Sequence, residues 1–327
     1  MSSEKNEPKG MLFFNFLSIV GITLFAVFNF IGMMFFFDGT IGTSLLITLG
    51  LTVLLAALLI LMCVAKAKDN NISLWRTVEF SALALFIITA GASFFGPVRS
   101  LCIMGSKSEI QAAAQADKAA IAALFAEYEE KEKEAITHTQ NGLGSCIGKD
   151  MQEDLADWCR KANLTTGSGS LKQESINSFA DNQRLRLIDG MQNNIKAPAE
   201  VTLNSSIGVF ESWNIFSMPA QPAILQDLAG ETAEALTDLS GKANLPFIEN
   251  DDYTNEGYIS QENQTFTYDA PQMKSAKAIS NVGYGKWYAW LILVVMHVLT
   301  LCSYFWTLRS RKTLIKEKAI TNGSTIL

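Results

Sequence analysis

The chain has 327 residues, of which 49% are hydrophobic and 18% are charged, and its formal net charge is −6. Its hydrophobic residues are not spread evenly but are concentrated in four nearly charge-free runs, which excludes an ordinary soluble globular protein. Residues 100–285 hold 26 acidic against 14 basic side chains, a net charge of −12. So acidic a segment argues against nucleic acid and anionic lipid as its partners and favours solubility.

The four apolar runs predict four transmembrane helices, over residues 11–37, 44–65, 74–96 and 286–308. The hydrocarbon core of a bilayer is about 30 Å thick, which a helix of about 20 residues crosses. The spans must be helical because backbone polar groups find no water to bond inside the hydrocarbon. The first run is longer than the core of a signal peptide and no small-residue cleavage site follows it, so we expect a retained span.

Basic residues predict the orientation of these spans, because Lys and Arg are enriched on the cytoplasmic side of a membrane. Ten of them flank the spans on one side: Lys5, Lys9, Lys66, Lys68, Arg76, Arg309, Arg311, Lys312, Lys316 and Lys318. Residues 1–10 and 309–327 are therefore predicted to be cytoplasmic tails, with Arg309, Arg311 and Lys312 as inside anchors. Residues 97–285 are the predicted extracytoplasmic domain. We expect a multi-pass protein of the cell membrane, in a bacterial inner membrane rather than a eukaryotic one.

The predicted extracytoplasmic domain follows Gly96-Pro97, which we expect to end the third span. An Ala-, Glu- and Lys-rich stretch comes next, with an apolar stripe that Asp117 and Lys131 interrupt. It predicts one amphipathic helix packed on its own domain, with a coiled coil as the alternative. Further helices are expected over residues 151–162, 170–197 and 219–241, extended chain over 201–216, and a hairpin over 257–269. The predicted fold class is an all-α membrane protein: four transmembrane helices, with a mainly α-helical (minor β) domain inserted between helices 3 and 4.

Three cysteines face outward in this arrangement, namely Cys102, Cys146 and Cys159. Cys146 and Cys159 enclose a short loop and are the predicted disulfide, because oxidation is allowed outside the cytoplasm. Closing such a loop stabilises a fold by about 3 kcal/mol in the chain-entropy model. Cys102 is then a free or intermolecular thiol. The alternative is that all three are free thiols.

Three polar side chains fall inside the predicted spans: Asn15, Asn29 and His297. We interpret the two asparagines as contacts between helices, within one chain or between copies, since side-chain amides bond helices together in lipid. A proton relay through His297 would need ionisable partners deep in the spans, and the sequence has none there. A neutral His297 bonded to a carbonyl or to Asn29 is the preferred interpretation.

The sequence has no recognisable catalytic motif, metal-binding motif or cofactor-binding motif, and His138 is the only other histidine. Residues 250–263 resemble a calcium loop, but Asn263 stands where the closing glutamate belongs, which favours a solvated acidic loop. We therefore expect a non-enzymatic membrane protein without cofactors, whose outer domain is a scaffold or sensor in a membrane-associated complex. Its expected partners are membrane lipid, another protein and further copies of itself. The alternatives are a channel-forming subunit of a homo-oligomer, with Asn15 and Asn29 lining the pore, and an enzyme with an outward site.

Overall fold

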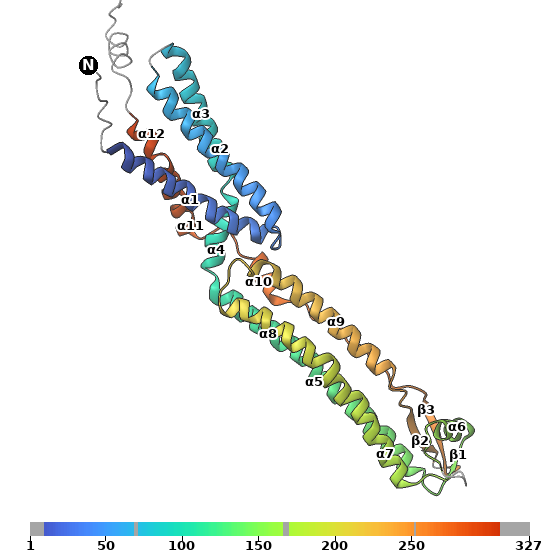
Figure 1. Ribbon diagram of the computed structural model, residues 1–327. Helices are drawn as coiled ribbons and strands as arrows, with labels where there is room; N and C mark the ends of the chain where they lie inside the picture. The colour runs from blue at the N-terminus through green and yellow to red at the C-terminus, as the bar shows by residue number, and fades with distance from the viewer. Residues whose placement is uncertain (1–9, 69–70, 166–169, 252, 308–327) are drawn as a thin grey trace, which may run out of the picture. The chain divides into compact units, whose positions relative to one another are not determined.

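The computed structural model of the chain describes residues 10–68, 71–165, 170–251 and 253–307 (Figure 1). It is mostly helical, with 76% helix and few strands, as the composition predicts. The chain divides into two compact units. Unit 1 comprises residues 1–109, 214–220 and 279–327, and unit 2 comprises residues 110–213 and 221–278.

Three helices of unit 1 are long and apolar enough to cross a membrane, in agreement with the first three predicted spans. They are α1 (Gly10–Phe36), α2 (Ile41–Ala67) and α3 (Ile72–Ala92), and the apolar stretch of α3 continues into α4 (Phe95–Met104). The expectation that Gly96-Pro97 closes the third span is wrong. Pro97 lies in the first turn of α4, where a missing N–H costs no helical hydrogen bond.

The end of the chain adds two short helices to unit 1, α11 (Trp287–Thr300) and α12 (Cys302–Trp306), which pack along α1. Gly21 permits the close approach, because a Cβ built there would lie 2.5 Å from the backbone nitrogen of Thr300. The rings of Phe14 and Trp306 stack with centroids 4.1 Å apart. A short 3₁₀ turn, η3 (Met218–Ala220), also belongs to this unit.

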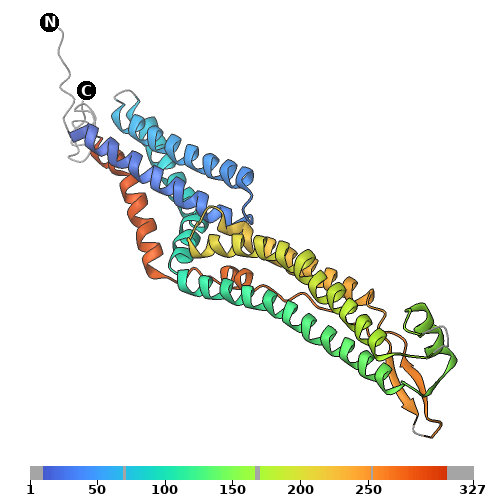
Figure 2. The ribbon, with the colours of Figure 1, turned by 60° about the horizontal axis from the view of Figure 1, so that its bottom comes forward.

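Unit 2 is built on α5 (Lys107–Ser145), whose predicted apolar stripe is buried. A second long helical segment runs antiparallel to it, through α7 (Gln173–Arg184), two π-turns η1 (Leu185–Asp189) and η2 (Gln192–Lys196), and α8 (Ala197–Glu211). The direction follows from three hydrogen-bonded contacts: Gln111 with the Phe210 carbonyl, Tyr128 with the Leu187 carbonyl, and Gln140 with Asn177. The third helix, α9 (Gln221–Gly241), packs on α8. In Figures 1 and 2 these helices lie side by side.

Two sequence predictions about this helical segment are wrong. Residues 201–216 are not extended, since α8 covers most of them, and Pro198 does not end the helix. Proline lacks an N–H and its ring crowds the carbonyl four residues before it in a regular α-helix. The chain reaches Pro198 through π-turns, in which the Ala197 N–H bonds the Gln192 carbonyl, so the turn before the proline is already wider than an α-turn.

A small sheet closes the end of unit 2 that holds Ser145. Its strands β1 (Asp150–Met151), β2 (Phe247–Asp251) and β3 (Glu256–Gln261) lie in the order β1-β3-β2, with β2 and β3 antiparallel and β1 parallel to β3. α6 (Glu153–Lys161) packs on β3. The predicted hairpin over 257–269 is therefore displaced. Its first arm is β3, but β3 pairs with the preceding strand β2, through a turn in which Asn255 adopts a φ of +58°.

The predicted second arm of the hairpin is instead an extended segment, residues 263–273, which we call the strap. It runs beside α5 and α9 (Figure 2) and ends at α10 (Lys274–Ser280). Its backbone N–H groups bond mainly to side chains of the helices: Phe266 to Ser240 Oγ at 3.0 Å, Tyr268 to Thr237 Oγ1 at 3.0 Å, and Met273 to Gln226 Oε1 at 3.1 Å. The strap is thus fixed to unit 2 without being part of a sheet.

Candidate functional site

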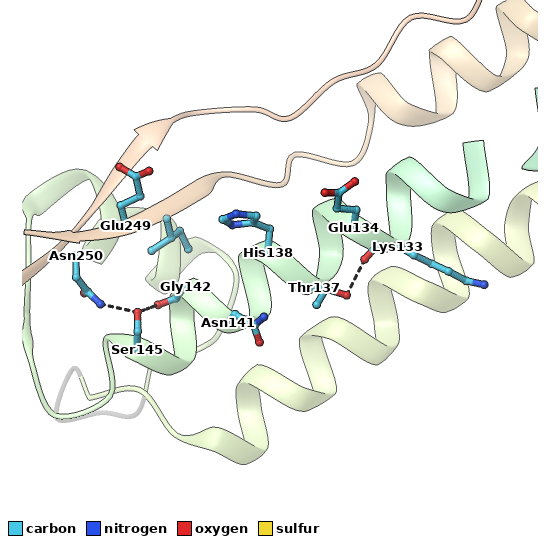
Figure 3. Close-up of a pocket in the computed structure, with 10 residues that line it drawn as sticks. Lys133, Glu134, Thr137, His138, Asn141, Gly142, Ser145, Glu249 and Asn250 are labelled. Carbon is cyan, nitrogen blue, oxygen red and sulfur yellow. Dashed lines mark hydrogen bonds between the residues drawn. The ribbon is translucent and has the colours of Figure 1, made fainter. Parts of the chain in front are cut away.

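An open groove of about 640 Å³ lies between α5 and β2 in unit 2 (Figure 3). One face of α5 supplies most of its lining, and β2 supplies the rest. The lining residues are Lys133, Glu134, Thr137, His138, Asn141, Gly142, Ser145, Ile248, Glu249 and Asn250. Because the α5 residues recur at helical spacing, they form one stripe along the groove.

Gly142 sets how closely the strand approaches the helix. A Cβ built at Gly142 would lie 2.6 Å from the backbone oxygen of Ile248, so only glycine fits at this crossing. Next to it, the Thr139 hydroxyl donates to the carbonyl of Pro246 at 2.9 Å. The ring of His138 packs on the ring of Phe247, with centroids 3.9 Å apart. The strand is therefore held against the stripe at several points.

The polar groups at one end of the groove are already paired. The Asn250 side-chain amide donates to the Ser145 hydroxyl at 2.6 Å, and that hydroxyl donates to the Gly142 carbonyl at 2.6 Å. Glu249 accepts a hydrogen bond from the hydroxyl of Tyr258 at 2.8 Å. These bonds fix the walls of the groove before any ligand arrives, which lowers the entropic cost of binding.

The remaining polar groups give the groove a negative character. Lys133 forms an ion pair with Glu129, which lies outside the lining. Glu134 and Glu249 leave two carboxylates in the lining, and both side chains are exposed. In Figure 3 the side chains of Glu134, His138 and Glu249 follow one another along the groove. Such an arrangement suits a cationic group, and in the described residues no set of three His, Cys, Asp or Glu side chains is placed to hold a metal ion.

The predicted disulfide is not formed in the structure. Cys146 and Cys159 are free thiols, buried in the same apolar cluster as Leu143, Leu155 and Ile248. The Cys146 Sγ lies 3.2 Å from the Gly142 carbonyl of α5 and 3.4 Å from the Asn250 side-chain oxygen of β2. Burial raises the pKa of the Cys159 thiol to about 12, and the neighbouring Cys146 adds to the increase. Burial raises the pKa of Cys146 as well.

The predicted intramembrane polar residues belong to unit 1 and make contacts between its helices. Asn29 is fully buried and donates to the Thr48 hydroxyl on α2 at 3.1 Å. The Asn15 side-chain oxygen accepts from the Ser303 hydroxyl on α12 at 2.9 Å. Both amides thus bond within the chain.

His297 lies on α11 among apolar side chains. Its Nδ1 is 2.8 Å from the Leu293 carbonyl, and its ring packs edge-on against Phe25 and Phe86. The carbonyl contact is one of the two that the sequence suggests, while Asn29 bonds elsewhere. The predicted anchors Arg309, Arg311 and Lys312 lie outside the described residues.

Sequence reasoning singled out His138 as the only outward histidine but did not find the groove around it. Glu249 and Asn250 are more than a hundred residues after the α5 stripe, and no local pattern links the two. The one available signal is glycine at position 142 near the end of a long helix, which indicates a close approach of another backbone. Comparison of the chain with protein-family models, curated proteins and solved structures finds no match.

Proposed function

We propose that the chain is a non-enzymatic integral membrane protein whose unit 2 is an extracytoplasmic scaffold or sensor within a membrane complex. The groove between α5 and β2 is the proposed binding site, and its ligand is a basic segment of a partner protein. The observation that carries this proposal is the pair of exposed carboxylates, Glu134 and Glu249, in a groove whose walls are fixed by hydrogen bonds.

We further propose that α11 and α12 together form a fourth span, which puts both termini on the cytoplasmic side. Residues 287–306 are helical except at Leu301, and the Leu301 N–H still bonds the His297 carbonyl. At 1.5 Å per residue this length corresponds to about 30 Å, the thickness of the hydrocarbon core. The packing of both helices along α1 supports the same topology.

Binding rather than catalysis is proposed because the groove is open and its ionisable side chains are exposed. An exposed carboxylate contributes little to affinity, about 1 kcal/mol or less for one ion pair. Several such charges still select a partner of opposite charge and speed its arrival. We therefore expect a moderate, salt-sensitive interaction that discriminates by charge.

A photo-crosslinking amino acid at Thr137 tests this proposal in intact membranes, because Thr137 lies in the groove and is exposed. We expect a crosslinked partner protein whose yield falls several-fold in the double variant Glu134→Gln, Glu249→Gln and falls with added salt. The matched control is Glu130→Gln, Glu200→Gln, which removes the same charge from exposed positions outside the groove and should leave the yield unchanged.

A second crosslinker position, Ala119, reports on the exposed surface of α5 away from the groove. The proposal is wrong if the Thr137 adduct is insensitive to both carboxylates, or if Ala119 captures the same protein with equal yield. An adduct formed with lipid alone would also contradict it.

A further inference from the structure

A carboxyl group lies completely buried in the core of unit 2. Glu132 of α5 is 0% exposed, and neither of its oxygens has a hydrogen-bond partner at bonding geometry among the described residues. A buried ionised carboxylate without a partner costs several kcal/mol, so such groups are normally paired or neutral. The Ser240 hydroxyl already accepts a hydrogen bond from the Phe266 N–H. It lies close enough to Glu132 to lower the pKa of that carboxyl, which offsets part of the effect of burial.

The strap and α5 supply the aromatic groups around this carboxyl. Tyr268 of the strap and Tyr128 of α5 are both buried, with ring centroids 5.5 Å apart, and the Tyr268 hydroxyl has no hydrogen-bond partner in the described residues. Burial and the nearby Glu132 raise the pKa of both phenols, so both are neutral at physiological pH. Tyrosine has no positively charged form, so neither phenol supplies a counter-charge for an ionised Glu132.

Two basic groups lie near this cluster, and neither bonds the Glu132 carboxyl among the described residues. Arg186 of η1 acts on Tyr128, and its guanidinium donates to the Lys242 carbonyl at 2.5 Å. Lys131 lies over the Tyr268 ring at 5.3 Å and over the Phe266 ring at 5.8 Å, and it pairs with Glu127. Burial is the dominant influence, and it raises the pKa of the Glu132 carboxyl above its ordinary value.

We propose that Glu132 is a proton-binding site whose protonated form holds the strap against α5 and α9, and whose deprotonation releases the strap. A protonated carboxyl needs no counter-charge and can donate its own hydrogen bond. Loss of the proton to water leaves a charge that only hydration can stabilise. The strap is the element that can admit water, because side-chain hydrogen bonds rather than a sheet or helix ladder hold it.

The direction of the pH effect follows from linkage. The Glu132 carboxyl has a higher pKa while the strap covers it than when the strap is released and water reaches it. The stabilisation of the closed strap is therefore complete below the ordinary carboxyl pKa and is lost as the pH rises through the raised value. The pH-dependent release of the strap goes beyond partner binding in the groove. Crosslinking measures binding in the groove, whereas hydrogen exchange of the strap amides measures release of the strap.

Amide hydrogen exchange on the full chain in lipid nanodiscs tests the proposal. Protection is measured in peptides covering residues 263–273 over a pH series from below the ordinary carboxyl pKa to neutrality, corrected for intrinsic exchange. We expect protection to fall by about tenfold per pH unit between the two pKa values and then to level off. Glu132→Gln, which mimics the protonated group, should abolish the slope. Glu130→Gln, the same change two residues away at an exposed position outside the groove, should keep it.

Three results would overturn the proposal: a pH-independent strap in the natural sequence, an unchanged slope in Glu132→Gln, or an equal slope in the amides of α5 and α9, which would mean that the whole unit responds. The protection of α5 in each variant shows whether it is folded. If Glu132→Gln does not fold, Glu132→Met takes its place, because it removes the titrating group and keeps the size of the side chain.

Discussion

Asp117 is the residue whose replacement most directly tests the packing of unit 2. It is fully buried on α5, and its two carboxylate oxygens accept the N–H groups of Lys274 at 2.5 Å and Ser275 at 2.9 Å. These residues begin α10, so Asp117 acts as the N-terminal cap of a helix 157 residues further along the chain. Free N–H groups at a helix start favour a negative charge.

We expect Asp117→Asn to weaken this contact strongly although it preserves the shape of the side chain. Asparagine keeps one acceptor oxygen and turns an NH₂ group toward the other N–H. The change loses a charge-assisted hydrogen bond, worth about 1.5–3 kcal/mol, and leaves a buried donor unpaired. We therefore expect a cost of about 2–4 kcal/mol, equivalent to about a 30- to 1,000-fold increase in local opening.

Hydrogen exchange of peptides spanning the start of α10 measures this opening in the full chain. Asp238→Asn is the matched control, because it removes the same charge from an exposed position on α9 and should stay within about 0.5 kcal/mol of the natural sequence. If the two variants show equal protection at residues 274 and 275, Asp117 does not cap α10 and the reasoning fails.

The remaining predictions concern helix crossings and thiols. A Cβ at Gly32 would lie 1.9 Å from the Gly96 oxygen, so Gly32→Ala should reduce the yield of folded protein in detergent, measured by size-exclusion chromatography, whereas Gly42→Ala, with open space around it, should not. Equal yields would show that α1 and α4 do not cross closely at this glycine. Cys146 and Cys159 should resist alkylation in the native protein and both react after unfolding without reductant, as read by mass spectrometry. A product two hydrogens lighter that resists alkylation would reveal the disulfide that the structure lacks.

Composition alone predicts the three candidate spans of unit 1, because about 20 consecutive apolar residues have few other stable environments. The apolar stripe of α5 is likewise a local pattern, and its members Ile110, Ile121 and Leu124 are buried. Asp117 looked like an interruption of that stripe. Its role depends on the start of α10, which no helical period can indicate.

The candidate site could not be predicted from the sequence for the same reason, because it depends on a contact between segments far apart in the chain. The groove forms only where β2 lies against α5. Which segment lies there depends on which segment pairs with β3. β3 pairs with the segment before it, whereas the sequence favoured the segment after it. The strap then takes a path set by single side chains such as Thr237 and Ser240, which resemble any other polar residue on a helix.

The π-turns in the long helical segment of unit 2 affect which of its residues face the core. From Ile176 to Leu203 the inward-facing residues recur at intervals of about four, whereas an ideal α-helix repeats every 3.6 residues and would carry them gradually off the core. Each π-turn contains more residues per revolution than an α-turn, so it brings the inward-facing residues back toward the core. The number of residues between Arg184 and Ala197, more than their chemical identity, therefore selects which side of α8 meets the rest of the unit.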